Sequence, residues 1–141
     1  MADKKLELRK KKIKKLLDVL RRLYPKPHTA LHYSTPWELM VAVQLSAQCT
    51  DKKVNEVTAK LFRKYRTLDD YVKAKPKEFE KYIYQTGFYK NKTKNILAAA
   101  KMVKEKWDGK LPRTMTELTT IPGVARKTAN VVLSNLYEKA E

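Results

Sequence analysis

The chain has 141 residues, of which 43% are hydrophobic, 33% are charged and three are glycine. This composition excludes a disordered polar chain, because it supplies enough apolar material for one buried core, and the scarcity of glycine favours helices. A single cysteine excludes a disulfide framework, and a net charge of +17 favours a polyanionic partner such as nucleic acid over a merely lysine-rich surface.

The first predicted element is an amphipathic helix over residues 4–23, where leucines and an isoleucine recur at three- and four-residue steps between basic side chains. The sequence Tyr-Pro-Lys-Pro at residues 24–27 ends this helix, because proline cannot continue it. Residues 1–26 hold eleven lysines and arginines against three acidic residues, so this segment carries about half of the net charge.

A second helix is predicted to begin at Pro36 with Thr35 as its N-cap and to run over "PWELMVAVQLSAQ". It is apolar on most sides, which predicts a central, buried position. A third helix is predicted to follow, with Thr50 or Asp51 as its cap.

The remaining predicted helices cover residues 68–74, 76–85, 89–107 and 126–137, with a helix of one or two turns after Thr114. The sequence contains no strand pattern, repeat or low-complexity linker. The predicted fold is therefore all-α, with six to eight helices.

The turn before the last helix predicts an anion-binding site. Pro122 fixes φ, and Gly123 permits a bend that a Cβ atom would block. The backbone N–H groups of Gly123, Val124 and Ala125 then precede a helix N-terminus without intrahelical acceptors, and Arg126 adds positive charge. An ordinary connection between two helices is the alternative for a lone Pro-Gly-Val, but the net charge and the adjacent lysine favour a phosphate site.

Three segments together carry a family resemblance: "ELMVAVQLSAQCTDKKVNEVTAKLF", "YIYQTGFYKNKTKNILAAAK" and "IPGVARKTANVVLSN". They resemble, in order and spacing, the early buried helix with its glutamine loop, the wedge loop and the helix-hairpin-helix motif of the endonuclease III family of DNA glycosylase/AP lyases. The likeness runs from about residue 7 to the last residue. It departs at Ala125, where the commonest form of the hairpin has a second glycine.

The resemblance implies a six-helix barrel domain over residues 25–141 that contains the hairpin. It also implies an N-terminal helix over residues 1–24 that would pack on a cluster domain absent from this chain. The implied function is base excision repair of damaged double-stranded DNA, in which an N-glycosylase removes oxidised pyrimidines and nicks the strand by β-elimination. Mismatch-adenine and thymine glycosylases share the hairpin, but a lysine at position 127 favours the oxidised-pyrimidine branch.

The resemblance also implies site residues. Lys127 matches the catalytic lysine of the family, whose amine can displace the base and form a Schiff base with the sugar. Gln48 matches the residue that fills the hole left by an extruded base, and Phe88 matches the wedge beside it. Asp51 lies in the motif near the pocket, although helix capping alone would explain it.

The expected DNA contacts comprise these two side chains, two lysines after the wedge, and the hairpin: Gln48, Phe88, Lys90, Lys92, Ile121, Gly123, Val124, Ala125 and Arg126. Lys90 and Lys92 are expected to contact phosphates, or else to form a solvated helix start. Ile121 and Val124 are also expected to anchor the turn in the core.

In the family, a catalytic aspartate and the four cysteines of an iron–sulfur (4Fe–4S) cluster follow the last helix. These 141 residues contain no counterpart of either, and Glu138 and Glu141 do not occupy the matching position. The chain is therefore expected to be an N-terminal part that holds no metal or cofactor itself, whereas full-length relatives are expected to hold the cluster.

Two other functions remain open at this point: a non-catalytic helix-hairpin-helix DNA-binding module, and a basic RNA-binding or assembly protein. The charged N-terminus has no apolar core region, which predicts neither a signal peptide nor a membrane span. We expect an intracellular, prokaryotic-type monomer in the cytoplasm, associated with the nucleoid.

Overall fold

Helix starts in this chain coincide with threonine caps and prolines. The hydroxyls of Thr35, Thr50 and Thr114 each accept a backbone N–H from the following helix, and Pro36 occupies a first-turn position. These contacts confirm the predicted caps and decide for Thr50 over Asp51 at the third helix. Thr67 forms a further cap, in a capping box with Asp70.

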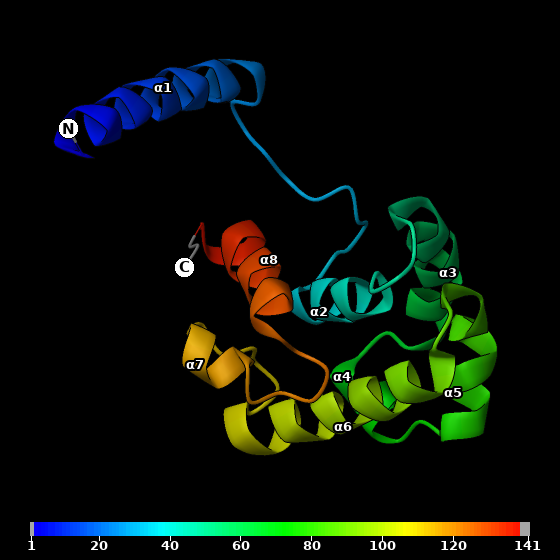
Figure 1. The fold of residues 1–141 in the computed structure, drawn as a ribbon. Coiled ribbons are helices and arrows are strands. Elements are labelled where there is room, and N and C mark those ends of the chain that lie inside the picture. Colours follow the sequence, from blue (N-terminus) through cyan, green and yellow to red (C-terminus); the bar gives the residue numbers. More distant parts are fainter. Residues whose placement is uncertain (1, 139–141) are drawn as a thin grey trace.

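The computed structural model describes residues 2–138, in which every regular element is a helix and no strand occurs (Figure 1). The elements in that range are α1 (Ala2–Leu23), α2 (Pro36–Leu45), α3 (Asp51–Lys64), α4 (Leu68–Val72), α5 (Pro76–Ile83), the 3-10 helix η1 (Tyr84–Thr86), α6 (Tyr89–Trp107), α7 (Met115–Leu118) and α8 (Arg126–Tyr137). This order confirms the all-α prediction.

Two helices end earlier than the sequence predicts. The second stops at Leu45, because Gln48 adopts a positive φ of 55° that no α-helix can contain. The predicted helix over 76–85 is divided: α5 ends at Ile83, and the tighter η1 follows. Both differences place a short irregular turn where the sequence suggested continuous helix.

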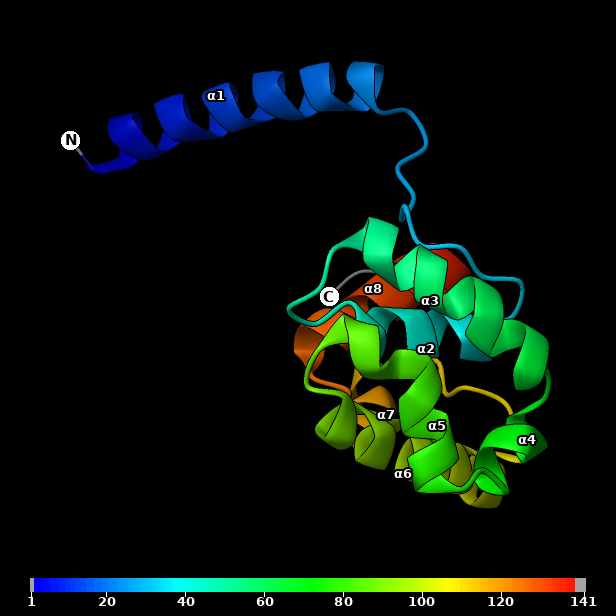
Figure 2. The ribbon, with the colours of Figure 1, turned by 90° about the vertical axis from the view of Figure 1, so that its right-hand side faces the viewer.

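The central helix is α2, as its apolar composition predicts. Eight of its ten residues are buried, and it packs against α3, α6 and α8 (Figures 1 and 2). Burying one leucine, valine or methionine side chain contributes about 1.5–3 kcal/mol, so α2 supplies much of the core energy. Its C-terminal end therefore offers a rigid base for the turn that follows it.

The helix α1 stands apart from the others (Figures 1 and 2). Every residue from Asp3 to His28 is exposed, including the apolar stripe, where Leu16 is 59% and Leu23 is 65% exposed. No described residue covers this stripe. The division into residues 1–24 and 25–141, the packing of the first helix on a further domain and the barrel arrangement all stay predictions.

Candidate functional site

Two buried side chains fix the turn between α7 and α8 to the core. Ile121 is 2% and Val124 is 5% exposed, which confirms that they anchor the turn. The Val124 N–H donates to the Ile121 carbonyl at 3.0 Å. Their side chains face the core and the Val124 N–H is used within the turn, so the expected contact of these two residues with DNA stays a prediction that concerns their backbone.

The N-terminus of α8 keeps free donors. Ala125 is its N-cap, and no side chain among the described residues caps the helix. The N–H groups of the first turn therefore lack helical acceptors, and the positive end of the helix dipole adds to their field. Arg126 and Lys127 are both exposed at this end. The anion site stays a prediction, and its available donors would lie on α8 rather than at Val124.

Gly123 sits in close contact with the core. Its φ of +77° lies in the left-handed region, and a Cβ atom there would come within 2.5 Å of Gln44 Oε1 and 2.9 Å of Asn95 Cβ. Gln44 belongs to α2 and is 6% exposed, and its Nε2 has no partner in the part of the chain that the structure describes. Glycine is thus required both for backbone conformation and for space.

A pocket of about 460 Å³ lies beside the start of α8. It is lined by the segment before α2, the end of α2 with its following turn, the first residue of α3, and α8: Thr29, Leu31, Val43, Ser46, Ala47, Gln48, Asp51, Lys127, Thr128 and Val131. Three residues singled out in the sequence therefore share one cavity: the neighbours Gln48 and Asp51, and Lys127 from a distant part of the chain.

Sequence reasoning missed the hydroxyl and backbone groups of this pocket. The Thr29 N–H donates to Asn135 Oδ1 of α8 at 3.0 Å, which ties the segment before α2 to the pocket wall. Ser46 and Thr128 add hydroxyls to the lining, and the Ser46 hydroxyl donates to the Val43 carbonyl at 2.7 Å. The signal for Thr128 was its position next to Lys127; for Thr29 no local signal exists.

Gln48 and Phe88 occupy strained positions. They have φ values of 55° and 47°, in a left-handed region that few residues other than glycine adopt. Such conformations cost of order 1–3 kcal/mol each and cluster at functional sites. Phe88 follows Gly87 and is 70% exposed, so its ring is free for the wedge position that the resemblance implies. The expected contact of this exposed ring with DNA stays a prediction.

Lys92 does not lie where the sequence predicts. It is 7% exposed, and its Nζ donates to the carbonyl oxygens of Leu45 at 2.9 Å and Thr86 at 2.8 Å. Burial lowers the pKa of this amine. The expected phosphate contact is therefore wrong for Lys92, because its donors are used inside the protein, whereas Lys90 is exposed as predicted.

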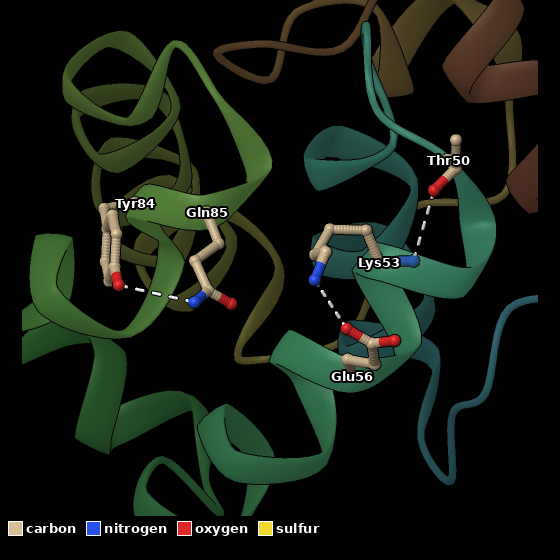
Figure 3. A network of polar contacts seen from close by, with 5 residues as sticks. All are labelled: Thr50, Lys53, Glu56, Tyr84 and Gln85. Carbon is tan, nitrogen blue, oxygen red and sulfur yellow. Dashed lines mark hydrogen bonds and ion pairs between the residues drawn. The ribbon is translucent and has the colours of Figure 1, made fainter.

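Figure 3 shows α3 and η1 facing each other near these turns. Lys53 Nζ pairs with Glu56 Oε2 at 2.6 Å on α3, and Gln85 Nε2 donates to the Tyr84 hydroxyl at 3.3 Å on η1. The hydrogen bond and charge of Glu56 raise the pKa of Lys53. The three-residue spacing of Lys53 and Glu56 could have predicted this pair; the facing of α3 and η1 could not be predicted from local sequence.

The described residues contain no group of three or more histidine, cysteine, aspartate or glutamate side chains that could hold a metal ion. A 4Fe–4S cluster needs four thiolate ligands, and the chain has one cysteine, so its residues do not fit such a cluster. Among residues 2–138, no helix combines the length and hydropathy required to cross a membrane.

The sequence of this chain resembles one family of known proteins over most of its length. Residues 41–137 match the family described as HhH-GPD superfamily base excision DNA repair protein. Endonuclease III of Synechocystis sp. is 45% identical over 134 residues, which cover 95% of this chain and 61% of that protein. Endonuclease III of Bacillus subtilis is 47% identical over 124 residues, which cover 88% of this chain and 57% of that protein.

Solved structures give the same result. A non-covalent endonuclease III–DNA complex matches with a TM-score of 0.86 at 45% identity, covering 92% of this chain and 60% of that one. A trapped endonuclease III–DNA covalent intermediate also matches with a TM-score of 0.86 at 45% identity, covering 92% of this chain and 61% of that one. The chain thus spans about three fifths of the length of these relatives.

Proposed function

Because the chain belongs to the HhH-GPD superfamily of base excision DNA repair proteins, we propose that it acts on damaged double-stranded DNA as a DNA N-glycosylase with AP lyase activity. The substrate class that we propose is oxidised pyrimidines. The observation that carries the proposal is the pocket that Lys127 shares with Gln48 and Asp51, next to the uncapped start of α8. Relatives solved with DNA, one of them as a covalent intermediate, support it.

The proposed binding mode follows from the charges and the exposed groups. The free N–H groups of α8 and the side chain of Arg126 hold a backbone phosphate beside the pocket. Phe88 wedges into the base stack, and Gln48 fills the space of the extruded nucleotide. The damaged base then enters the pocket, where Lys127 lies on the wall.

In the proposed reaction, Lys127 Nζ loses a proton and its lone pair bonds to C1′ of the damaged nucleotide. The C1′–N bond to the base breaks, and its electron pair goes to the base, which takes up a proton. The sugar ring then opens to a C1′=N imine as O4′ is protonated. Loss of a C2′ proton lets the C3′–O bond break with phosphate as the leaving group, and water hydrolyses the imine to regenerate the amine.

Asp51 supplies the carboxylate among the residues that line the pocket. We propose that it accepts or returns a proton in these steps, since a positioned carboxylate is a suitable general acid or base. Asp51→Asn tests this role, because asparagine keeps the shape of the side chain but cannot accept or return the proton.

A nicking assay tests the proposal. The 141-residue chain is incubated with duplex DNA that carries one abasic site, with undamaged duplex and with structured RNA. We expect nicking of the abasic strand alone, with an unsaturated aldehyde at the 3′ end as β-elimination requires. Binding without nicking would indicate a non-catalytic DNA-binding module. Preference for structured RNA would indicate a basic RNA-binding or assembly protein.

DNA binding is expected to weaken steeply with salt. Each phosphate neutralised contributes about 0.9 to the slope of log affinity against log salt concentration, so three contacts give a slope of about −3. Lys90→Ala should reduce the slope by about one unit, because Lys90 is exposed. The measurement is fluorescence anisotropy between 50 and 300 mM salt, roughly the range in which counterion release dominates. A flat salt response would contradict a nucleic-acid partner.

Gln48→Ala and Phe88→Ala are expected to weaken binding to duplex with an abasic analogue by roughly tenfold to a hundredfold, since stacking on one aromatic ring is worth about 1–3 kcal/mol. Affinity for undamaged duplex should change little, because neither side chain inserts there. Tyr24→Ala is the matched control, since Tyr24 is 64% exposed and follows α1, far along the chain from both turns. Equal losses on both DNAs would make these residues general contacts.

A further inference from the structure

Lys92 is a buried cation that no described carboxylate neutralises. It belongs to α6, is 7% exposed, and forms no ion pair among the described residues. The protein desolvates this amine, which is why burial lowers its pKa. A lysine held in such a place needs compensating contacts, because a buried charge without them is costly.

Two backbone carbonyls provide that compensation. Lys92 Nζ donates to Leu45 at 2.9 Å and to Thr86 at 2.8 Å. Leu45 is the last residue of α2, whose terminal carbonyls lack helical donors and carry the negative end of the helix dipole. Thr86 is the last residue of η1 and is 2% exposed, with its hydroxyl donating to the Ile83 carbonyl at 2.8 Å. Each carbonyl is therefore anchored in the core on its own side.

The two carbonyls also mark the bases of the two strained turns. Leu45 is followed by residues 46–50, which we call the Gln48 turn, and Thr86 is followed by residues 87–88, which we call the Phe88 turn. Each turn places its site residue at a positive φ, two or three residues beyond the carbonyl that Lys92 holds. One ammonium group thus connects the starts of two turns that lie about forty residues apart in the chain.

We infer that Lys92 is a positioning residue that holds the Gln48 turn and the Phe88 turn at a fixed separation, so that both side chains enter DNA as one unit. This role of Lys92 in the insertion of both side chains into DNA rests on the proposed function. Lys92 does not touch the substrate; it acts through the backbone of both turns. Holding both turns in place before binding avoids the entropy that two independent turns would lose on the DNA.

The consequence is energetic coupling between Gln48 and Phe88. With Lys92 present, the two side chains insert together. The losses of binding free energy caused by Gln48→Ala and by Phe88→Ala should therefore not add in the double variant. With Lys92→Met, the turns move separately and the two losses should become additive. Methionine matches the length of the lysine stem but donates no hydrogen bond, so it removes both anchors with little change in volume.

The matched control is Lys90→Met, which removes an equal charge from an exposed position two residues earlier on α6. Each protein is titrated with undamaged duplex and with duplex containing a tetrahydrofuran abasic analogue. Lys92→Met should lower the preference for the analogue roughly tenfold, the size of effect that one or two lost hydrogen bonds produce, while affinity for undamaged duplex stays within about twofold. Lys90→Met should weaken binding to both DNAs alike.

A second measurement needs no DNA. In a Cys49→Ser background, spin labels are attached at Ala47→Cys in the Gln48 turn and at Tyr84→Cys in η1, and the distance distribution between them is measured by pulsed electron resonance. Lys92→Met should broaden this distribution, and Lys90→Met should leave it narrow. Circular dichroism monitors folding, and Lys92→Gln, which retains one amide donor group, replaces Lys92→Met if that variant loses its helical signal.

The outcomes separate the two proposals. A narrow label distribution in Lys92→Met, or an unchanged preference for the abasic analogue, would overturn the positioning role. A purely structural role would lower binding to both DNAs in proportion to the unfolded fraction and would leave the coupling intact. A wild-type chain without any preference for the analogue would instead overturn the proposed function, whatever the labels show.

Discussion

Lys127→Gln is expected to abolish the covalent adduct that borohydride traps between this chain and abasic DNA. The Nζ amine condenses with the C1′ aldehyde, water leaves, and hydride reduces the resulting imine to a stable secondary amine. Trapping should fall by roughly a thousandfold or more, a modest share of the effective concentration that a positioned amine can reach. Other lysines are numerous, but Lys127 is the lysine that lines the pocket.

Arg126→Gln is the matched control for this variant, since it removes the same charge from the adjacent exposed position on α8. It should weaken DNA binding but leave the yield of adduct per bound complex unchanged. The adduct is quantified by denaturing gel electrophoresis with both proteins at saturating concentration. Trapping that survives Lys127→Gln undiminished would remove the proposed nucleophile, and mass spectrometry of the adduct would then identify the reacting amine.

Gly123→Ala is expected to be the most damaging single-methyl change in the hairpin. The added Cβ would meet Gln44 Oε1 at 2.5 Å and Asn95 Cβ at 2.9 Å, and the φ of +77° disfavours any side chain. Left-handed strain costs about 1–2 kcal/mol and overpacking about 1–3 kcal/mol, so we expect the free energy of unfolding to fall by roughly 2–5 kcal/mol. DNA binding should also fall, because the displaced turn no longer presents the start of α8 to a phosphate.

Gly109→Ala separates strain from crowding. Gly109 has a similar φ of +80°, but its added Cβ would meet only Leu68 Cδ2, at an ordinary 3.6 Å. This variant should therefore lose about 1–2 kcal/mol from strain alone and keep its DNA affinity. Urea unfolding gives the free energies, and anisotropy titration at one salt concentration gives the affinities. Equal losses of stability in the two variants would show that Gln44 and Asn95 yield without cost.

Helix caps and the apolar faces of helices depend on a few neighbouring residues, so both could be predicted from the sequence. Thr35, Thr50 and Thr114 cap helices as predicted, and the apolar run of α2 is buried at the centre. The exposed Phe88 could also be predicted, because Gly87 and a lysine-rich stretch flank it. The division between α5 and η1 was missed, since the energies of α and 3-10 turns differ too little for local sequence to decide between them.

The sequence by itself determined the helical fold class, the family resemblance and the residue types available for a phosphate site and an amine nucleophile. Only the tertiary structure decided which groups meet. Lys92 is buried between two turns, whereas Lys90 is exposed to water. The Val124 N–H donates within its own turn, and Gly123 packs against Gln44. The physical reason is that burial and hydrogen-bond partners depend on contacts between segments far apart in the chain, and periodicity within one helix carries no information about its partner.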